Sequence, residues 1–362
     1  MRVAIAAGGS GGHVIPALTV LDALMDRAPA TEAAFFGPDD RGERELLGGR
    51  NLAFYRVPSA AMRGRSPLAM ARGAVRVIGG IVTAAQALRS YRPTVVFSTG
   101  GYASFPTCLA ARLLRVPVVV FLPDVEPGWA VRAERSLAGK IATTTEAALA
   151  HLPRRKTVVT GYPVRAEFFR GSRSSSRAVL GLRESDAVLL VAGASQGARA
   201  INRALFAVIA DVLAGAHVFH VTGTADAADA ERLRESLPEP ARGRYHPSSF
   251  RDDLPTVMLA ADLAVLRAGA STLGELPAAA LPAILIPGTY AGGHQRDNAR
   301  WLAAAGAAIV LEESAIAELG PRLTELLGDR DRLSAMHDAA WRLARPAAAH
   351  EIAGLVMQEA EK

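Results

Sequence analysis

Glycine-rich turns that lead into polar residues are the parts of this sequence best suited to do chemistry. The first, Gly8-Gly9-Ser10-Gly11-Gly12, follows a strand-like run and passes through His13 into a helical pattern. Glycine lets the backbone approach an anion, and the free amides at a helix start carry partial positive charge. The turn is therefore a candidate phosphate or substrate cradle, with a plain tight turn as the alternative. Histidine titrates near neutrality, so His13 either removes a proton from a hydroxyl nucleophile or caps the turn.

Two further glycine turns repeat this arrangement. Gly100-Gly101-Tyr102-Ala103-Ser104 follows another strand-like run, and Ser195-Gln196-Gly197-Ala198-Arg199 opens a helix in the second half. Both turns have backbone amides that could bind a diphosphate. For the turn at Gly100, the alternative is that it merely connects a strand to a helix and binds no ligand. Arg165 lies between the two halves, where its guanidinium either pairs with the same phosphates or stays solvated.

The stretch Ala268-Gly269-Ala270-Ser271-Thr272-Leu273-Gly274-Glu275 is the most informative one. Small residues after a strand lead into a helix that Ser271 or Thr272 can cap, with Glu275 in its first turn. A carboxylate there can accept both hydroxyls of a ribose, and a capping box is the alternative. The polar run 292–299, which holds His294 and Gln295, also leaves a strand end and either binds sugar hydroxyls or forms an ordinary polar loop.

Motifs for several other chemistries are missing. The first turn lacks the dinucleotide-binding spacing, and neither a Walker loop nor a GxSxG elbow occurs. Asp329-Arg330-Asp331 lies between two helical patterns rather than after a strand, so we interpret it as solvation of helix ends and not as a metal ligand. The sequence predicts no metal site and no cofactor.

Strand-like runs alternate with helical patterns, which is typical of α/β folds with parallel sheets. The two halves look like copies of one architecture, because Gly8 and Gly193 open matching turns at an offset of 185 residues (193 minus 8). The polar stretch 171–177 predicts a linker, and we place the domain boundary near residue 165. Strands are predicted at 3–7, 33–36, 94–98, 116–122, 187–192, 263–266 and 283–286, and helices at 16–25, from 199, at 321–345 and from 347 to the end.

Composition narrows the class of protein. The chain has 362 residues, 50% of them hydrophobic, which is enough for two α/β cores. Cys108 is the only cysteine, so it excludes an internal disulfide, fits a reducing cytosol and is expected to be a buried thiol. The net charge of +6 suits nucleic acid, anionic lipid or phosphorylated substrates. Without the aromatic-basic interleaving of RNA-binding proteins, nucleic acid is not an expected partner.

Membrane contact is expected to be peripheral. The N-terminus lacks a basic-then-apolar leader, and the longest helix-like apolar stretch, Val77–Leu88, is far shorter than the ~20 residues of a membrane span. The predicted helix 67–89 is basic and amphipathic, with Arg72, Arg76 and Arg89 beside apolar residues. It either rests on anionic lipid or packs as an ordinary surface helix.

Together the motifs resemble glycosyltransferases of the GT-B architecture, and more narrowly the MurG family of undecaprenyldiphospho-muramoylpentapeptide β-N-acetylglucosaminyltransferases. Each motif is modest alone, but six in order over nearly the whole chain are specific. They are Gly8-Gly9-Ser10-Gly11-Gly12-His13, Gly100-Gly101-Tyr102, Gly161-Tyr162-Pro163-Val164-Arg165, Gly193-Ala194-Ser195-Gln196-Gly197-Ala198, Gly269-Ala270-Ser271-Thr272 through Glu275, and His294-Gln295 with Asn298-Ala299.

The resemblance implies a fold and its division into domains. Two Rossmann-like α/β domains are expected to face each other across a cleft. Residues 1–164 would form the domain that binds the acceptor and the membrane, and residues 165–345 the domain that binds the UDP-sugar. Residues 346–362 would form a helix that crosses back to the first domain.

The resemblance also implies a reaction and its residues. GlcNAc would pass with inversion from UDP-GlcNAc to the MurNAc 4-hydroxyl of undecaprenyl-pyrophosphoryl-MurNAc-pentapeptide, at the cytoplasmic face of the cell membrane, with His13 as the base. The substrate-binding residues would be Ser10, Gly11, Gly12, Gly100 and Gly101 at the acceptor diphosphate and donor sugar, Arg165, Ser195, Gln196, Gly197, Ala270, Ser271 and Thr272 at the phosphates, Glu275 on the ribose, Arg251 near the uracil through its backbone, and His294 and Gln295 at the GlcNAc hydroxyls.

One segment departs from the family pattern. Where the family usually has His-Glu-Gln-Asn before Pro-Gly, the chain has Asp124 at about the place of the asparagine that helps hold the donor sugar. A carboxylate accepts hydrogen bonds there but no longer donates them. The alternatives are a related UDP-sugar glycosyltransferase with another lipid or metabolite acceptor, a UDP-sugar epimerase, and a non-catalytic nucleotide-sugar-binding protein.

Overall fold

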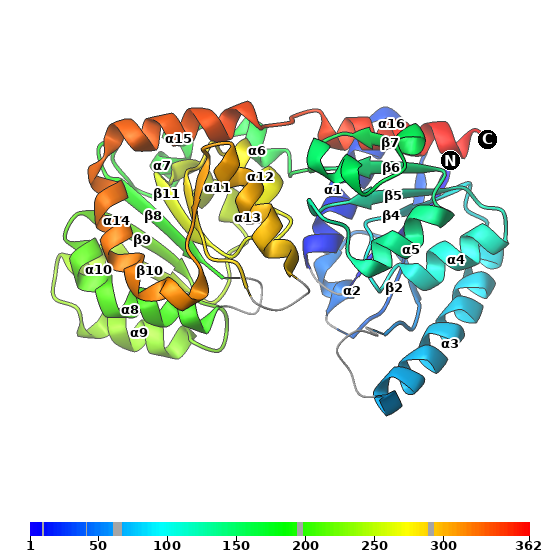
Figure 1. The fold of residues 1–362 in the computed structure, drawn as a ribbon, viewed down its shortest axis with the longest axis horizontal. Helices are drawn as coiled ribbons and strands as arrows, with labels where there is room; N and C mark the ends of the chain where they lie inside the picture. Colours follow the sequence, from blue (N-terminus) through cyan, green and yellow to red (C-terminus); the bar gives the residue numbers. More distant parts are fainter. Residues whose placement is uncertain (9–10, 41, 61–66, 194–197, 289–292) are drawn as a thin grey trace. The chain divides into compact units, whose positions relative to one another are not determined.

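The structure is a computed structural model, and it describes residues 1–8, 11–40, 42–60, 67–193, 198–288 and 293–362. It divides into two compact units. The first unit comprises Met1–Val164 together with Pro346–Lys362, and the second comprises Arg165–Arg345. Each unit contains one parallel β-sheet with helices packed on it (Figure 1). The expected α/β class with two Rossmann-like domains is confirmed.

The sheet of the first unit has the strand order β3-β2-β1-β4-β5-β6-β7. Its winding reverses between β1 and β4, which pair directly from Val3 with Val95 to Ala6 with Ser98. This is the topological switch point at which Rossmann-type sheets bind ligands. The strands are β1 (Arg2–Ala6), β2 (Glu32–Gly37), β3 (Ala53–Arg56), β4 (Val95–Ser98), β5 (Val118–Leu122), β6 (Lys140–Thr143) and β7 (Thr157–Val159).

Helices cover both faces of this sheet. One core cluster joins alternate residues of the strands, such as Ala4 and Val96, to side chains of α3, α4 and α5. On the opposite side, α16 contacts α1 and strands β4, β5 and β6. The helical elements are α1 (Gly11–Arg27), α2 (Glu43–Leu46), α3 (Pro67–Tyr91), α4 (Phe105–Leu113), α5 (Trp129–Leu137), η1 (Glu146–Ala150), η2 (Arg154–Lys156) and α16 (Ala348–Ala360).

The second sheet repeats the same plan, with the order β10-β9-β8-β11-β12-β13. Its switch point lies between β8 and β11, whose pairing ends with Ala192 opposite Leu266. The shared order explains why the turn after β1 and the turn after β8 align in the sequence. The strands are β8 (Ala187–Ala192), β9 (Ala216–Val221), β10 (Tyr245–Ser248), β11 (Leu263–Leu266), β12 (Ala283–Leu285) and β13 (Ala308–Val310).

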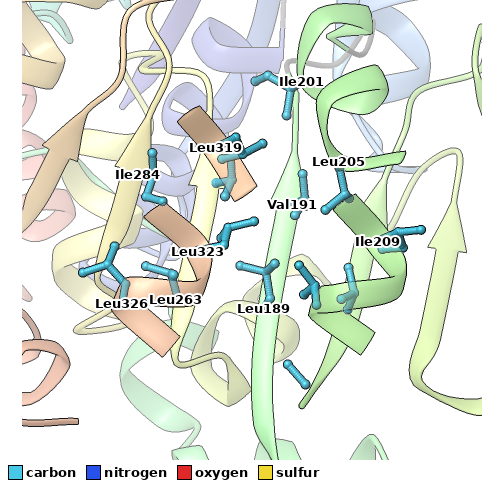
Figure 2. Packing of buried hydrophobic residues seen from close by; sticks show 14 of the residues in the cluster. Leu189, Val191, Ile201, Leu205, Ile209, Leu263, Ile284, Leu319, Leu323 and Leu326 are labelled. Atoms are coloured by element: carbon cyan, nitrogen blue, oxygen red, sulfur yellow. The ribbon is translucent and has the colours of Figure 1, made fainter. Parts of the chain in front are cut away.

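The core of the second unit shows how residue spacing produces this packing (Figure 2). Side chains two residues apart on a strand share a face, so Leu189 and Val191 point to the same side of β8. Helix α8 meets them with a stripe spaced by four residues, and α14 supplies a second stripe. Each fully buried side chain of this size contributes roughly 1.5–3 kcal/mol to folding. The stripes are Ile201, Leu205 and Ile209 on α8, and Leu319, Leu323 and Leu326 on α14.

The helices of the second unit pack around its sheet (Figure 1). The predicted helix from residue 199 is α8. The helical elements are α6 (Glu167–Arg170), α7 (Arg173–Val179), α8 (Arg199–Leu213), α9 (Ala227–Ser236), α10 (Ala241–Arg244), α11 (Leu254–Ala260), α12 (Thr272–Ala278), α13 (His294–Ala304), η4 (Glu313–Glu318), α14 (Leu319–Gly328) and α15 (Arg330–Arg342).

The prediction of a linker at 171–177 is wrong. Most of this stretch forms α7, which begins at a capping box between Ser172 and Ser175. Arg177 is fully buried in the second unit and its guanidinium pairs with Asp262 at 2.9 Å. The same guanidinium donates to the backbone carbonyls of Ala260, Arg183, Glu184 and Asp186. A composition of serine and arginine is typical of linkers, but here it caps a helix and pairs with a partly buried carboxylate.

The C-terminal region contains three helices. The predicted helix 321–345 is two helices, because Asp329 ends α14 and its carboxylate accepts the Arg332 amide at 2.9 Å to cap α15. The C-terminal helix α16 belongs to the first unit, as expected, and Arg27 of α1 donates to the carbonyl of His350 at 2.9 Å. Within the described ranges, no helix is both long enough and apolar enough to span a bilayer.

Candidate active site

The switch point of the first sheet brings two of the predicted glycine turns together. The turn 8–12 follows β1 and the loop 99–104 follows β4, and these strands are neighbours. Helix α1 begins at Gly11, several residues before the predicted start. Ser10 lies outside the described residues. Pro16 in α1 has no amide hydrogen for the carbonyl of Gly12, and that carbonyl accepts the Tyr162 hydroxyl at 3.3 Å instead.

His13 is fixed by two hydrogen bonds to one residue of the neighbouring loop. Its Nδ1 lies 3.0 Å from the carbonyl oxygen of Thr99, and the Thr99 hydroxyl donates to the His13 carbonyl at 2.9 Å. Because a carbonyl can only accept, Nδ1 carries the proton in the neutral ring, and Nε2 keeps the lone pair. The His13 ring is therefore oriented to accept a proton at Nε2.

The loop after β4 passes directly beside this ring. Gly100 has a φ of 76° and Gly101 a φ of 97°, which are left-handed conformations that favour glycine. A methyl group on Gly101 would lie 3.3 Å from Nε2 of His13, and one on Gly100 would lie 2.8 Å from Val131. The structure thus brings His13, Gly100 and Gly101 together. It also shows why glycine is needed at both loop positions, because a side chain there would strain the backbone and crowd its neighbours.

A buried polar cluster beneath this loop was not found by sequence reasoning. Glu134 of α5 is fully buried, and its two carboxyl oxygens lie 3.1 Å from the Ser98 hydroxyl and 2.7 Å from the Ser104 hydroxyl. Burial raises the pKa of Glu134 to about 8, although both serine hydrogen bonds act to lower it. A glutamate inside an arginine-rich helical pattern gives no sequence signal for such a role, because the helix turns it inward.

The switch point of the second sheet also gathers predicted residues. The turn with Ser195, Gln196 and Gly197 lies outside the described residues. Helix α8 begins just after it at Arg199, whose guanidinium lies 3.6 Å from a carboxyl oxygen of Asp226. On the neighbouring strand, β11 leads into residues 267–271 and then into α12. The ends of β8 and β11 lie at the same edge of the sheet, where Rossmann-type folds bind ligands.

Glu275 lies on α12 and is largely shielded from solvent. Burial raises its pKa, while a hydrogen bond from the Ser271 side chain and the positive charge of Arg165 act to lower it. The structure therefore brings Arg165, Ser271 and Glu275 together within the second unit. Nε of Arg165 is buried without a hydrogen-bond partner among the described residues, and one Nη lies 3.5 Å from the carbonyl of Asp252.

The expected side-chain cap of α12 does not form. Ser271 occupies the N-cap position but makes no side-chain cap bond, and the Thr272 hydroxyl donates to the Gly269 carbonyl at 2.6 Å instead. The capping box is also excluded, because Glu275 stands one residue beyond the N3 position. Ala270 and Ser271 are partly exposed in the turn before the helix.

Side chains of the polar run after β12 form hydrogen bonds to nearby backbone groups. Gln295 accepts the amide of Gly288 at 2.8 Å through Oε1, and Asn298 donates to the carbonyl of Ala268 at 3.2 Å. The second bond ties α13 to the turn that precedes α12. Nδ1 of His294 is buried without a partner in the described part of the chain. Of the run 292–299, Gly292 lies outside the described residues.

Arg251 and Asp124 occupy different surroundings. The guanidinium of Arg251 is bound to both carboxyl oxygens of Asp253, at 2.8 and 2.6 Å, and lies 5.3 Å from the centre of the Phe219 ring. The structure thus shows the side chain of Arg251 engaged within its own unit, and the predicted backbone contact with uracil stays a prediction. Asp124 is half-buried in the loop after β5, which the Thr144 hydroxyl anchors by donating to Pro123 at 2.8 Å.

Within the described ranges, no three histidines, cysteines or carboxylates are grouped so that they could hold a metal ion. Asp329 instead caps α15, as the sequence interpretation of helix-end solvation required. Cys108 is a buried thiol within the core of the first unit, and burial raises its pKa well above the usual range.

Two units that each contain a Rossmann-type parallel sheet with a topological switch point define the fold class. Family models then narrow this class. Residues 3–142 match the glycosyltransferase family 28 N-terminal domain, and residues 188–352 match the glycosyltransferase family 28 C-terminal domain. The chain belongs to glycosyltransferase family 28.

Curated relatives match the chain along its whole length. A protein of Roseiflexus sp. (strain RS-1) is 36% identical over 98% of this chain and 94% of its own length. One of Desulforudis audaxviator (strain MP104C) is 34% identical over 100% of this chain and 99% of its own. Both are named UDP-N-acetylglucosamine--N-acetylmuramyl-(pentapeptide) pyrophosphoryl-undecaprenol N-acetylglucosamine transferase.

Solved structures share the fold. MurG of Acinetobacter baumannii is similar with a TM-score of 0.75 and 24% identity, covering 99% of each chain. The UDP-GlcNAc 2-epimerase of Neisseria meningitidis is similar with a TM-score of 0.71 and 14% identity, covering 99% of this chain and all of its own. The fold is therefore shared by transferases and epimerases alike, so it does not distinguish between them. The relatives in sequence reported above are all named as transferases.

Proposed function

We propose that this glycosyltransferase moves GlcNAc from UDP-GlcNAc to the 4-hydroxyl of MurNAc in undecaprenyl-pyrophosphoryl-MurNAc-pentapeptide. The observation that carries this proposal is the orientation of His13, whose Nδ1 is bound to the Thr99 carbonyl and whose Nε2 lies beside Gly101. A transfer to a hydroxyl needs a base with a free lone pair at the acceptor. The full-length relatives named for this reaction support the choice of substrates.

The step is a single displacement with inversion. The MurNAc 4-oxygen forms a bond to the anomeric carbon of GlcNAc while the bond from that carbon to the β-phosphate oxygen breaks. The hydroxyl proton passes to Nε2 of His13, and UDP leaves with the electron pair. The backbone of Gly100 and Gly101, with the start of α1 at Gly11 and Gly12, lets the acceptor diphosphate approach without side chains in the way.

Donor binding falls to the second unit. Arg165 and the start of α8, with Ser195, Gln196 and Gly197, stabilise the charge that develops on the leaving diphosphate, an effect worth roughly a few kcal/mol per group. Ala270, Ser271 and Thr272 line the phosphates. Glu275 accepts the ribose hydroxyls, the backbone at Arg251 reads the uracil, and His294 and Gln295 bind the sugar, with Asp124 of the first unit as a further acceptor of hydrogen bonds.

Helix α3 supplies the membrane-facing surface in this proposal. Leu68, Val75 and Val82 recur every seven residues and are 63%, 71% and 54% exposed, with Ile78 at 62% between them. Large apolar side chains on one helix face rarely stay in water without a partner. With Arg72 on the same helix, the face suits peripheral binding to the anionic cytoplasmic leaflet, where the acceptor lipid is anchored.

The direct test is incubation with radiolabelled UDP-GlcNAc and a short-chain analogue of the lipid-linked MurNAc acceptor. We expect transfer by the natural chain and a loss of about 10²-fold or more in kcat for His13→Ala. His151→Ala is the matched control, because His151 is an exposed histidine of the same unit and should leave kcat unchanged. Equal activity of the two variants would remove His13 from the mechanism.

A second candidate, a UDP-sugar epimerase, is favoured only by the shared fold. It predicts isomerisation of UDP-GlcNAc without any acceptor. A related glycosyltransferase with another acceptor predicts release of UDP only when that acceptor is added. Omitting the acceptor and then supplying a panel of acceptors and UDP-hexoses distinguishes the three activities.

A further inference from the structure

The loop beside His13 rests on a hydrogen-bonded chain that runs through Glu134. The Gly100 amide donates to the Ser98 hydroxyl at 3.0 Å, and that hydroxyl lies 3.1 Å from one oxygen of Glu134. The other carboxyl oxygen lies 2.7 Å from the Ser104 hydroxyl, which in turn lies 3.0 Å from the Gly101 carbonyl. Ser98, Ser104 and Glu134 are all fully buried. Both glycines of the loop are thus tied to one carboxyl group.

Counting protons along this chain decides the charge of Glu134. Ser104 has one hydroxyl proton but two acceptors within reach, the Gly101 carbonyl and the carboxyl oxygen. If Glu134 is ionised, one of these two contacts has no proton and two oxygens repel each other. If Glu134 is neutral, its own proton goes to Ser104, and Ser104 donates to Gly101. Only the neutral acid satisfies every contact in one direction.

The surroundings agree with a neutral acid. No arginine or lysine of the described residues forms an ion pair with Glu134. On the same helix, Arg132 pairs with an exposed carboxylate and Arg135 donates to a carbonyl. The thiol of Cys108 on α4 stays protonated, since burial raises its pKa well above the usual range, and it is hydrogen-bonded to the Ser98 hydroxyl. As a donor it leaves the Ser98 proton for Glu134. His13 lies against Gly101, at the far end of the chain of bonds.

We propose that Glu134 acts as a neutral hydrogen-bonding acid that positions Gly100 and Gly101 against His13, and so is a positioning residue for the transfer reaction. This rests on the function proposed above. The carboxyl group touches no substrate, and its effect passes through the loop backbone. Its ionisation removes the proton that completes the chain, so alkaline pH loosens the loop.

Two substitutions separate positioning from folding. Glu134→Gln keeps one acceptor for Ser98 and one donor for Ser104, and it cannot ionise. Glu134→Leu keeps the volume but removes both bonds. Thr107→Val is the matched control on α4, because the Thr107 hydroxyl is buried without a partner among the described residues.

The experiment measures kcat and KM for transfer from UDP-GlcNAc between pH 6 and 9.5. We expect Glu134→Leu to lower kcat by roughly tenfold or more with KM for UDP-GlcNAc nearly unchanged, and Glu134→Gln to restore most of that loss. Above about pH 8 the natural chain should lose activity along a limb that Glu134→Gln lacks. Thr107→Val should behave as the natural chain.

Two results would overturn the proposal while leaving the function intact: a Glu134→Gln as impaired as Glu134→Leu, or the same alkaline limb in the natural chain and in Glu134→Gln. If the natural chain transfers nothing, the proposed function fails instead. Amide hydrogen exchange of the peptide 98–105 then tests the positioning alone. Its protection factor should fall above about pH 8 in the natural chain but not in Glu134→Gln, and equal profiles would refute it.

Discussion

Glu134 makes folding stability depend on pH in a way that Glu134→Gln should abolish. The pKa of this carboxyl group is about 8 in the folded chain and 4.5 when unperturbed. Between these values the folded state holds a proton that the unfolded state has lost. Stability therefore falls as pH rises through this window, by about 1.36 kcal/mol per pH unit. Below the unperturbed value both states are protonated and the penalty vanishes.

The size of the effect follows from the two pKa values. They lie about 3.5 pH units apart, so the full penalty above the folded pKa is about 5 kcal/mol. Between pH 5 and 7.5 the natural chain should lose about 3 kcal/mol relative to Glu134→Gln. Glutamine keeps both serine hydrogen bonds, so the difference isolates the ionisation.

The assay is urea unfolding of both proteins at a series of pH values. The chain has three tryptophans, and Trp129 is the one in the first unit, so Trp301→Phe with Trp341→Phe leaves a reporter for that unit. We expect the stability difference between the two proteins to change steadily across this range. A difference that stays constant from pH 5 to 7.5 would show that Glu134 is ionised in the folded chain, and the reasoning about its proton would be refuted.

Three further outcomes are expected. Gly101→Ala should lower kcat by about tenfold or more without unfolding the chain, because it strains a left-handed φ and places a methyl group 3.3 Å from Nε2 of His13, and steady-state kinetics with circular dichroism as the folding control checks this. Arg177→Met should destabilise the second unit by about 3–5 kcal/mol, because it removes a buried guanidinium from four backbone carbonyls and from Asp262, which keeps Arg173 as its remaining ion-pair partner, and urea unfolding followed by the two tryptophans of that unit measures it. Val75→Glu should reduce sedimentation with anionic vesicles severalfold while leaving turnover of a water-soluble acceptor unchanged, and unaltered vesicle binding would contradict the role of α3.

Much of the fold follows from local pattern. Short apolar runs that end in glycine predict parallel strands and their ligand-binding ends, and the matching turns at Gly8 and Gly193 predict two copies of one sheet. Element ends were less predictable. Helix α1 begins at Gly11 because the glycine turn itself enters the helix, although Pro16 suggests a later start.

Residues 171–177 show where composition misleads. Serine and arginine are typical of linkers, yet Ser172 caps a helix and Arg177 is buried on the carboxylate of Asp262, 85 residues away in the sequence. Such a long-range partner leaves no local trace. The break in the predicted helix at Asp329 was easier to predict from the sequence, since an aspartate followed by helix-forming residues is a typical N-cap.

The candidate site shows the same division. The glycine turns predict His13, Gly100 and Gly101 as site residues. At Gly100 and Gly101 the reason is local, because the left-handed backbone there favours glycine. Nothing local announces Glu134, whose role arises when α5 turns it under a loop some thirty residues earlier in the chain. The sequence indicates that Glu275 needs polar neighbours but does not say which residues they are. In the structure they are Ser271 and Arg165.

The central claim is that His13 serves an inverting transfer of GlcNAc, and proton NMR of the anomeric centre during turnover tests it most directly. With the lipid-linked MurNAc analogue present, the α-anomeric signal of UDP-GlcNAc should give way to a β-linked disaccharide signal in the natural chain, and should persist with His13→Ala. A product of α configuration, or isomerisation of the donor with no acceptor consumed, would contradict the account.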